Sequence, residues 1–147
     1  MTEKGATVTT EASQLTLARY TVLNALQMSL IECEADASVR SIARAMADNT
    51  VHCIVVRGIE REDRSGNRIR WGIVSDLDLM AGLRPGFNQA TAGELAASEV
   101  IVMNPSDTLE HAAQLMAEHE TGHAVVVDAG EPVGIISTLD VARFAAG

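Results

Sequence analysis

Apolar positions in two stretches of the chain follow the spacing of an amphipathic helix. In each stretch they fall at i, i+3, i+4 and i+7, which places the side chains on one face of a helix. The first set is Val39, Ile42, Ala43 and Met46, and the second is Leu109, Ala112, Ala113 and Met116. We therefore expect two helices, each of which packs one apolar stripe against a core.

A short apolar run follows each predicted helix. The runs Cys53–Val56 and Ala124–Val127 are too short for a helix and rich in β-branched side chains, which is typical of buried strands. A second run comes after each of them, at Trp71–Val74 and Val133–Ile136, and a short second helix follows. With a first strand near Ile31 or Ile101, each half reads strand, helix, strand, strand, helix. The pattern predicts an α+β fold.

The elements repeat because the sequence repeats. Gly72–Asp78 (GIVSDLD) returns as Gly134–Asp140 (GIISTLD), at an offset of 62 residues, whereas upstream pairs such as Met46 and Met116 lie 70 apart. The first copy thus carries eight additional residues between Gly58 and Gly72. They are mostly charged and contain a Ser-Gly-Asn turn signal, which predicts a longer hairpin with a polar tip.

The repeat also predicts the domain organisation. We expect a flexible N-terminal tail at 1–16, a first repeat at 17–86 and a second repeat at 87–147. A three-stranded sheet with helices on one face leaves its other face uncovered. We therefore expect the two copies to pack about a pseudo-twofold axis, with a cleft between them.

Composition excludes several classes of partner and site. Aromatic residues make up only 3% of the chain and the formal net charge is −9, so we expect an aliphatic core and neither a nucleic-acid nor a membrane-surface partner. No apolar run approaches the ~20 residues that span a bilayer, and the N-terminus lacks a secretory h-region. These features favour a cytoplasmic protein in which Cys33 and Cys53 are reduced. Three histidines in the second copy lack the spacing of a metal site, so no metal is expected; they are His111, His119 and His123.

The repeated Ser-x-x-Asp segment has a structural and a functional interpretation. Ser75 with Asp78, and Ser137 with Asp140, match the capping box of a helix start, which stabilises by about 1 kcal/mol and carries no function. A strand that runs into a helix start can also present a carboxylate to the adjacent hydroxyls of a ribose. Gly72 and Gly134 would then let a ligand approach the backbone.

With both copies of this motif, the chain resembles the CBS domain family over roughly residues 17–147. CBS domains occur as tandem pairs called Bateman modules, and the resemblance implies that the motif contributes to binding an adenosine ligand, with Asp78 and Asp140 holding the ribose. Arg143, one turn after Asp140, is a candidate phosphate contact, or else a solvated side chain; Ala81 takes its place in the first copy.

The resemblance implies a stand-alone sensor of AMP, ADP, ATP or S-adenosylmethionine, with no catalytic machinery and no obligatory cofactor. Its signal would leave through a homodimer or an unknown protein partner. The homodimer is expected from apolar residues on the second helices: Leu77, Leu79, Met80, Leu83, Leu139, Val141 and Phe144. Two alternatives stay open, a ligand-free interaction module and a small enzyme that uses the histidines.

Overall fold

The computed structural model describes residues 17–26, 30–63, 65–85, 89–96 and 100–147, and these form two compact α+β units. Unit 1 combines Met1–Met28 with Ile101–Gly147, and unit 2 is Ser29–Val100. The predicted tail at 1–16 lies outside the described residues. No helix in the described part of the chain has the length and apolar character needed to cross a membrane.

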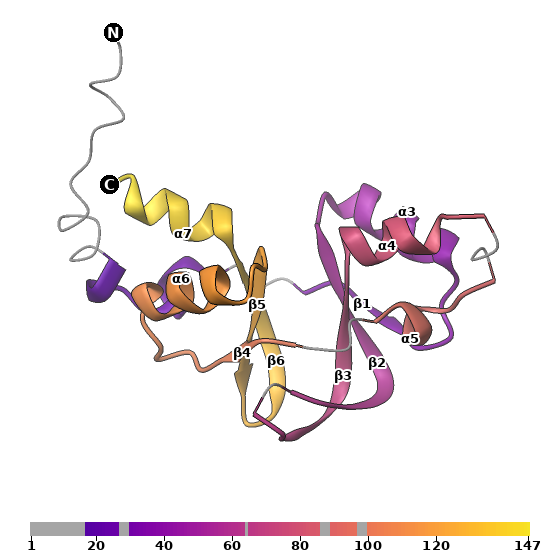
Figure 1. Cartoon of the computed structure of the whole chain (residues 1–147), viewed down its shortest axis with the longest axis horizontal. Coiled ribbons are helices and arrows are strands. Elements are labelled where there is room, and N and C mark those ends of the chain that lie inside the picture. Colours follow the sequence, from indigo (N-terminus) through magenta and orange to yellow (C-terminus); the bar gives the residue numbers. More distant parts are fainter. Residues whose placement is uncertain (1–16, 27–29, 64, 86–88, 97–99) are drawn as a thin grey trace, which may run out of the picture. The chain divides into compact units, whose positions relative to one another are not determined.

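Unit 2 is a three-stranded sheet with helices packed on it (Figure 1). Strand β1 (Glu32–Glu34) pairs in parallel with β2 (Cys53–Glu62), and β2 pairs antiparallel with β3 (Arg68–Ser75). Its helices are α3 (Val39–Asn49), α4 (Asp76–Gly82) and the short α5 (Ala92–Leu95).

Unit 1 repeats this arrangement. Strands β4 (Val102–Met103), β5 (His123–Asp128) and β6 (Glu131–Ser137) pair in the same order and directions. Its helices are α2 (Val22–Ala25), α6 (Leu109–Glu118) and α7 (Thr138–Ala145). The predicted order of strand, helix, strand, strand, helix is thus confirmed in both units.

The long helices form where the apolar stripes predicted them. Each begins at a hydroxyl that accepts a hydrogen bond from a backbone amide one turn later: Ser38 from Ser41 at 3.1 Å and Thr108 from His111 at 3.1 Å. The stripe residues pack against the sheets, and the alanine at the i+4 position of each helix is half-buried. The fully packed positions are Val39, Ile42, Met46, Leu109, Ala112 and Met116.

Each of the short helices α2 and α5 packs in the unit that is formed mainly by the other sequence repeat. In α5, the amides of Ala92 and Gly93 donate to the carbonyls of Ala37 and Ala35 at 2.9 and 2.8 Å, so α5 completes unit 2. The spatial units therefore differ from the repeats at 17–86 and 87–147, because α5 belongs by sequence to the second repeat.

Helix α2 makes the reciprocal connection in unit 1. Val22 donates its amide to the Asp107 carbonyl at 2.8 Å, and Leu109 donates to the Tyr20 carbonyl at 3.0 Å. Sequence reasoning did not predict these four-residue helices. The sequence feature that could have predicted them is the capping box of α5, formed by Thr91 and Glu94. Thr21, the N-cap of α2, lies 70 residues before Thr91, at the offset of the repeats.

The longer hairpin of the first copy is confirmed, and beyond β2 the Asp63 amide donates to the Asn67 carbonyl at 2.9 Å, just before β3. Asp63 organises this turn, because its carboxylate accepts from the amides of Ser65 and Asn67 at 2.9 Å each. Asp63 is only 8% exposed, so the tip is polar but not entirely solvated.

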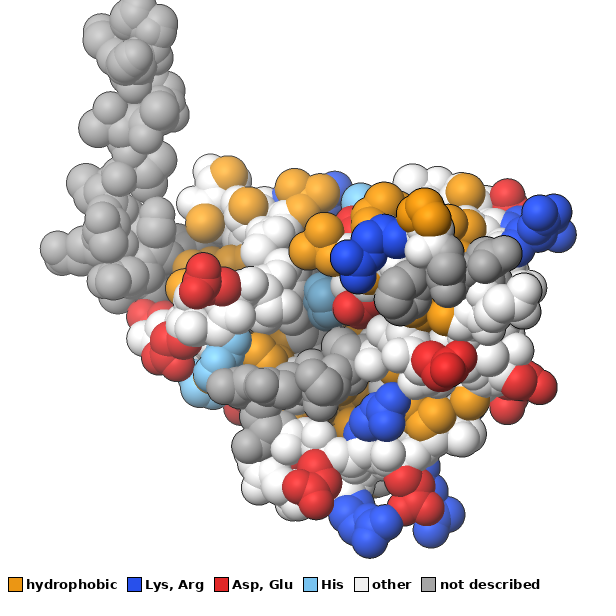
Figure 2. Space-filling model, turned by 45° about the vertical axis from the view of Figure 1, so that its right-hand side comes forward, with side chains coloured by type: hydrophobic (Ala, Val, Ile, Leu, Met, Phe, Trp, Pro, Cys, Tyr) orange, Lys and Arg blue, Asp and Glu red, His pale blue; other side chains and the backbone are white. Residues whose placement is uncertain are grey.

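The expected dimer face on the second helices needs a correction. Leu77, Met80, Leu83 and Leu139 are exposed, but Leu79 and Val141 are buried in the cores of their own units. Phe144 is half-buried and packs edge-on against Tyr20, with ring centroids 4.9 Å apart. Figure 2 shows hydrophobic side chains along the upper edge of unit 2, where α4 lies, and further ones lower on the same face. The apolar surface that remains is thus smaller than the sequence suggested.

Candidate ligand-binding junctions

The first candidate site lies where β3 runs into α4, and we call Ser75–Asp78 the α4 junction. The Ser75 amide and hydroxyl both donate to Oδ2 of Asp78, at 2.8 and 2.9 Å, and the Asp78 amide donates to Ser75 Oγ at 3.2 Å. The capping box predicted from the sequence is therefore formed.

The second candidate site, the α7 junction at Ser137–Asp140, has almost the same geometry. The Ser137 amide and hydroxyl donate to Oδ2 of Asp140 at 2.9 Å each, and the Asp140 amide donates to Ser137 Oγ at 3.2 Å. The Asp140 side chain is only 8% exposed, whereas Asp78 is half-buried.

These contacts give the serine and the aspartate of each junction different roles. In each junction the serine amide and hydroxyl proton are already used, so the serine positions the carboxylate rather than offering a donor to a ligand. Within the described residues, no hydrogen bond reaches Oδ1 of Asp78 or Asp140. A carboxylate oxygen has two lone-pair sites, so each Oδ1 can accept from adjacent hydroxyls.

The two glycines of the motif lie in closely packed surroundings. At Gly72, a Cβ atom would lie 2.6 Å from Cδ1 of Ile59 and 3.3 Å from Cβ of Ala96. The space that was expected to admit a ligand is thus filled by Ile59, which belongs to the extended part of β2. Gly134 is buried and pairs with Val126 of β5.

We expect Gly72→Ala to destabilise the protein by about 1–3 kcal/mol, because the added methyl overpacks against Ile59. Ile59→Ala in the same chain should recover part of this loss, since it empties the space that the methyl needs. Chemical denaturation of the two single variants and the double variant measures the coupling. Additive effects would show that Ile59 is not the obstacle.

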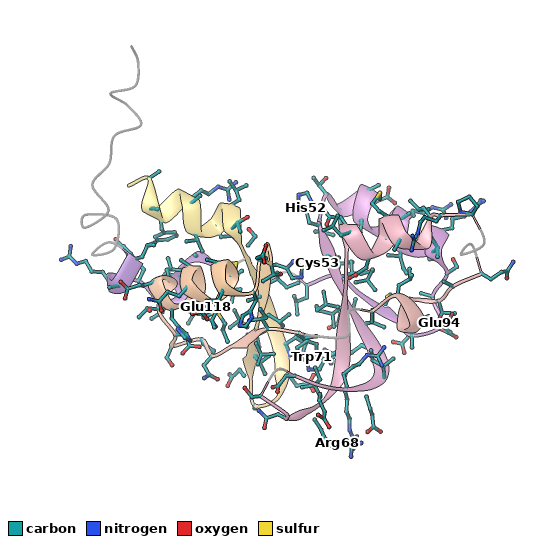
Figure 3. The ribbon with its side chains drawn as sticks, in the orientation of Figure 1. His52, Cys53, Arg68, Trp71, Glu94 and Glu118 are labelled. Atoms are coloured by element: carbon teal, nitrogen blue, oxygen red, sulfur yellow. The ribbon has the colours of Figure 1, made fainter. Side chains whose placement is uncertain are left out.

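His52 precedes the central strand of the first copy, as the sequence indicated, but its contact with Asp76 beside the α4 junction was not predicted. His52 Nδ1 lies 3.2 Å from Asp76 Oδ2, with side chains 88% and 54% exposed. The His52 carbonyl accepts from the Asp76 amide at 2.8 Å, which ties the end of β2 to the first residue of α4. Figure 3 shows His52 and Cys53 at this end of β2.

The strand registers agree with the 70-residue offset between the sequence repeats. Cys53 lies opposite Ser75, and His123 lies opposite Ser137. His52, which precedes β2, corresponds to Gly122, which precedes β5 and whose carbonyl accepts from the Thr138 amide at 3.0 Å. The α4 junction therefore has a thiol where the α7 junction has an imidazole.

Cys33 and Cys53 are free thiols, and the sheet register keeps them apart. Cys33 lies opposite Val56, three residues along β2 from Cys53. Three residues of a strand span about 10 Å, beyond the reach of a disulfide, and an odd offset places side chains on opposite faces. No bond between them can form in this fold.

Burial, reinforced by Asp76 and Asp78, raises the pKa of Cys53 to about 12, and burial together with Glu34 raises the pKa of the Cys33 thiol. We expect iodoacetamide at pH 8 to leave Cys53 unmodified in the native protein, because only about one thiol in 10⁴ would be ionised. Mass spectrometry should find half-buried Cys33 modified first. Equal labelling in guanidinium is the control, and fast native labelling of Cys53 would contradict its burial.

Arg143 lies beside the α7 junction, as the sequence suggested. Its Nη1 is 3.8 Å from Oδ1 of Asp140, and its side chain is 62% exposed. This distance allows an ion pair but exceeds a hydrogen bond, so the guanidinium is free to turn toward solvent. Among the described residues, no three His, Cys, Asp or Glu side chains come together as a metal site.

The family model of the CBS domain matches residues 26–84 and 92–147. The chain belongs to the CBS domain family. It carries two CBS domains in tandem, and their matched segments each contain one of the junctions. CBS-domain proteins are typically regulatory, non-catalytic modules, and some pairs bind adenosine ligands.

Hypoxic response protein 1 of Mycobacterium tuberculosis is 32% identical over 77 residues, which cover 49% of this chain and 52% of that protein. The match thus spans about half the length of this relative. Among solved structures, the CBS domain of a bacterial CNNM/CorC family Mg²⁺ transporter in complex with ATP has a TM-score of 0.72 and 14% identity, covering 93% of this chain and 94% of its own.

The CBS domain pair of protein MJ0100, solved with 5′-methylthioadenosine and S-adenosyl-L-methionine, has a TM-score of 0.68 at 22% identity. The match covers 84% of this chain and 93% of that one. At these identities the solved structures establish the shared CBS fold alone.

Proposed function

We propose that this CBS pair is a regulatory sensor that binds an adenosine-type nucleotide at the Ser-x-x-Asp junctions. The ligand class is AMP, ADP, ATP or S-adenosylmethionine. Asp78 and Asp140 accept the ribose hydroxyls, while Ser75 and Ser137 hold the carboxylates in place. The proposal assigns no catalytic step to the chain.

The observation that carries this proposal is that, among the described residues, no hydrogen bond reaches Oδ1 of Asp78 or Asp140. Capping needs only Oδ2, which receives the serine amide and hydroxyl in both junctions. Burial of a carboxylate costs free energy unless its oxygens are satisfied, so the 8% exposed Asp140 favours a partner that supplies hydroxyl donors. Complexes of related folds with ATP and with S-adenosylmethionine support an adenosine ligand.

A thermal-shift screen tests the proposal with AMP, ADP, ATP and S-adenosylmethionine, followed by calorimetry. A ligand at 100 times its dissociation constant should stabilise the folded chain by about 2.7 kcal/mol. Matched concentrations of GMP and inorganic phosphate are the controls for base recognition and for nonspecific anion effects. If no adenosine ligand shifts the melting temperature or gives binding heat, the ribose-binding function is wrong.

A ligand-free interaction module is the second candidate. The capping boxes account for both Ser-x-x-Asp motifs without a ligand, and α4 exposes three apolar side chains on one face. These are Leu77, Met80 and Leu83, with 77%, 52% and 55% of their surface exposed. In this alternative the motifs are structural and the chain acts through a protein partner alone.

We predict a homodimer that uses this face of α4. Light scattering at micromolar concentration should give about twice the 15.6 kDa mass of the chain. Leu77→Glu with Leu83→Glu should shift the mass toward the monomer, because two charges would be buried in the interface. Leu23→Glu, on an exposed position of α2, is the matched control and should stay dimeric. A monomer mass for the unaltered chain would overturn this prediction.

A further inference from the structure

The two junctions share their capping geometry but differ in charge. The α4 junction holds two carboxylates, Asp76 and Asp78, and has Ala81 one turn further on. The α7 junction has Thr138 in place of Asp76, and Arg143 in place of Ala81. Formal charges of these side chains therefore cancel at the α7 junction and sum to −2 at the α4 junction when His52 is neutral.

The groups around the α4 junction also indicate a negative electrostatic potential there. Both Asp76 and Asp78 contribute to raising the pKa of the neighbouring Cys53 thiol, although burial is the larger cause. His52 faces Asp76 at 3.2 Å but is 88% exposed, so solvent screens its influence. A phosphate dianion brought to this junction would meet two carboxylates and no arginine among the residues described there.

The α7 junction combines a buried carboxylate with an exposed cation. Asp140 is 8% exposed and its Oδ1 accepts no hydrogen bond among the described residues, while Arg143 Nη1 stands 3.8 Å away. Because Arg143 is 62% exposed, the ion pair is weak and the guanidinium can be drawn to another anion. Guanidinium groups bind phosphate oxygens through paired hydrogen bonds.

We propose that Arg143 determines ligand class, so that the α7 junction selects adenosine ligands that carry a phosphate, whereas the α4 junction disfavours them. This inference rests on the proposed adenosine-binding function and assigns a different ligand charge to each junction. Asp140 accepts from the ribose, and Arg143 turns from Asp140 to the phosphate. The α4 junction binds uncharged or cationic nucleosides instead.

The test compares AMP with adenosine, which share base and ribose and differ in the phosphate. Calorimetry is carried out on the full chain with Asp78→Asn, which removes the proposed ribose acceptor of the α4 junction and isolates binding at the α7 junction. In this background, Arg143→Ala should weaken AMP binding about tenfold and change adenosine binding by less than about twofold. Arg143→Lys should recover part of the AMP affinity, because it restores the charge but not the paired donors.

Two further variants complete the design. Arg40→Ala removes an exposed arginine of α3 that is part of neither junction, and should leave both affinities unchanged. In the Asp140→Asn background, Ala81→Arg with Asp76→Thr gives the α4 junction the charges of the α7 junction. This change should raise the preference for AMP over adenosine at the α4 junction by about tenfold.

The outcomes separate this inference from the function on which it rests. Equal losses of AMP and adenosine affinity in Arg143→Ala would show that Arg143 only positions Asp140, and would overturn the inference. A second result would also overturn the inference while the proposed function stands. In this result Asp140→Asn abolishes adenosine binding, but the chain with Asp140 intact binds AMP no more tightly than adenosine. If the unaltered chain binds neither compound, the adenosine-binding function itself fails and the inference falls with it.

Discussion

Asp140→Asn should weaken adenosine-ligand binding by about ten- to a hundredfold while leaving the fold nearly intact. Asparagine keeps one oxygen to accept from the Ser137 amide and hydroxyl, so the capping contacts at 2.9 Å can persist. The other side-chain atom becomes an NH₂ donor that cannot accept a ribose hydroxyl. Calorimetry with AMP measures the affinity, and thermal unfolding measures the stability.

Ser137→Ala is the informative companion variant, because it removes the hydroxyl that caps α7 while keeping the Asp140 charge. We expect it to cost about 1 kcal/mol of stability, with a smaller loss of affinity than Asp140→Asn. Unchanged affinity in both Asp78→Asn and Asp140→Asn would contradict the ribose-binding role. The interaction module would then be the better account.

Trp71→Ala should lower the free energy of unfolding by about 3–5 kcal/mol, the largest stability effect that we predict for a single side chain. Trp71 is the largest of the fully buried side chains and lies on β3, opposite Arg57 of β2 (Figure 3). Because none of the Trp71 side chain is exposed, its removal leaves a cavity. Urea unfolding followed by circular dichroism measures the change.

Leu23→Ala provides the contrast, because Leu23 is 50% exposed and its removal should change stability by less than about 0.5 kcal/mol. Trp71→Phe should fall between the two variants, since it keeps most of the buried volume. A loss below 1 kcal/mol in Trp71→Ala would show that the neighbouring side chains collapse into the cavity.

Periodicity predicted much of the fold because local patterns specify helices and strands. The apolar stripes predicted α3 and α6, and the β-branched runs predicted β2 and β5. The internal repeat then fixed the order of elements in both units. What periodicity did not predict was the exchange of α2 and α5, because four residues are too few to show a helical stripe.

The candidate sites were predicted in part for a different reason. The Ser-x-x-Asp spacing identified both capping boxes, whose geometry depends only on residues three apart. The packing of Ile59 onto Gly72 and the pairing of His52 with Asp76 depend on strand register, which no local pattern specifies. Burial also distinguishes Asp140 from Asp78, although their motifs are nearly identical.

The exchange of short helices imposes an order on folding during synthesis. Unit 2 is one continuous segment, Ser29–Val100, and its parts can assemble as soon as that segment has left the ribosome. Unit 1 joins both ends of the chain, since the amide of Val22 needs the carbonyl of Asp107, made 85 residues later.

At about 5–20 residues per second, this delay is roughly 4–17 s, during which α2 has no partner strand or helix of its own unit. A nascent chain of which only the residues up to Val100 have left the ribosome would therefore contain a folded unit 2 and an apolar helix α2 without its partners, a state that chaperones recognise.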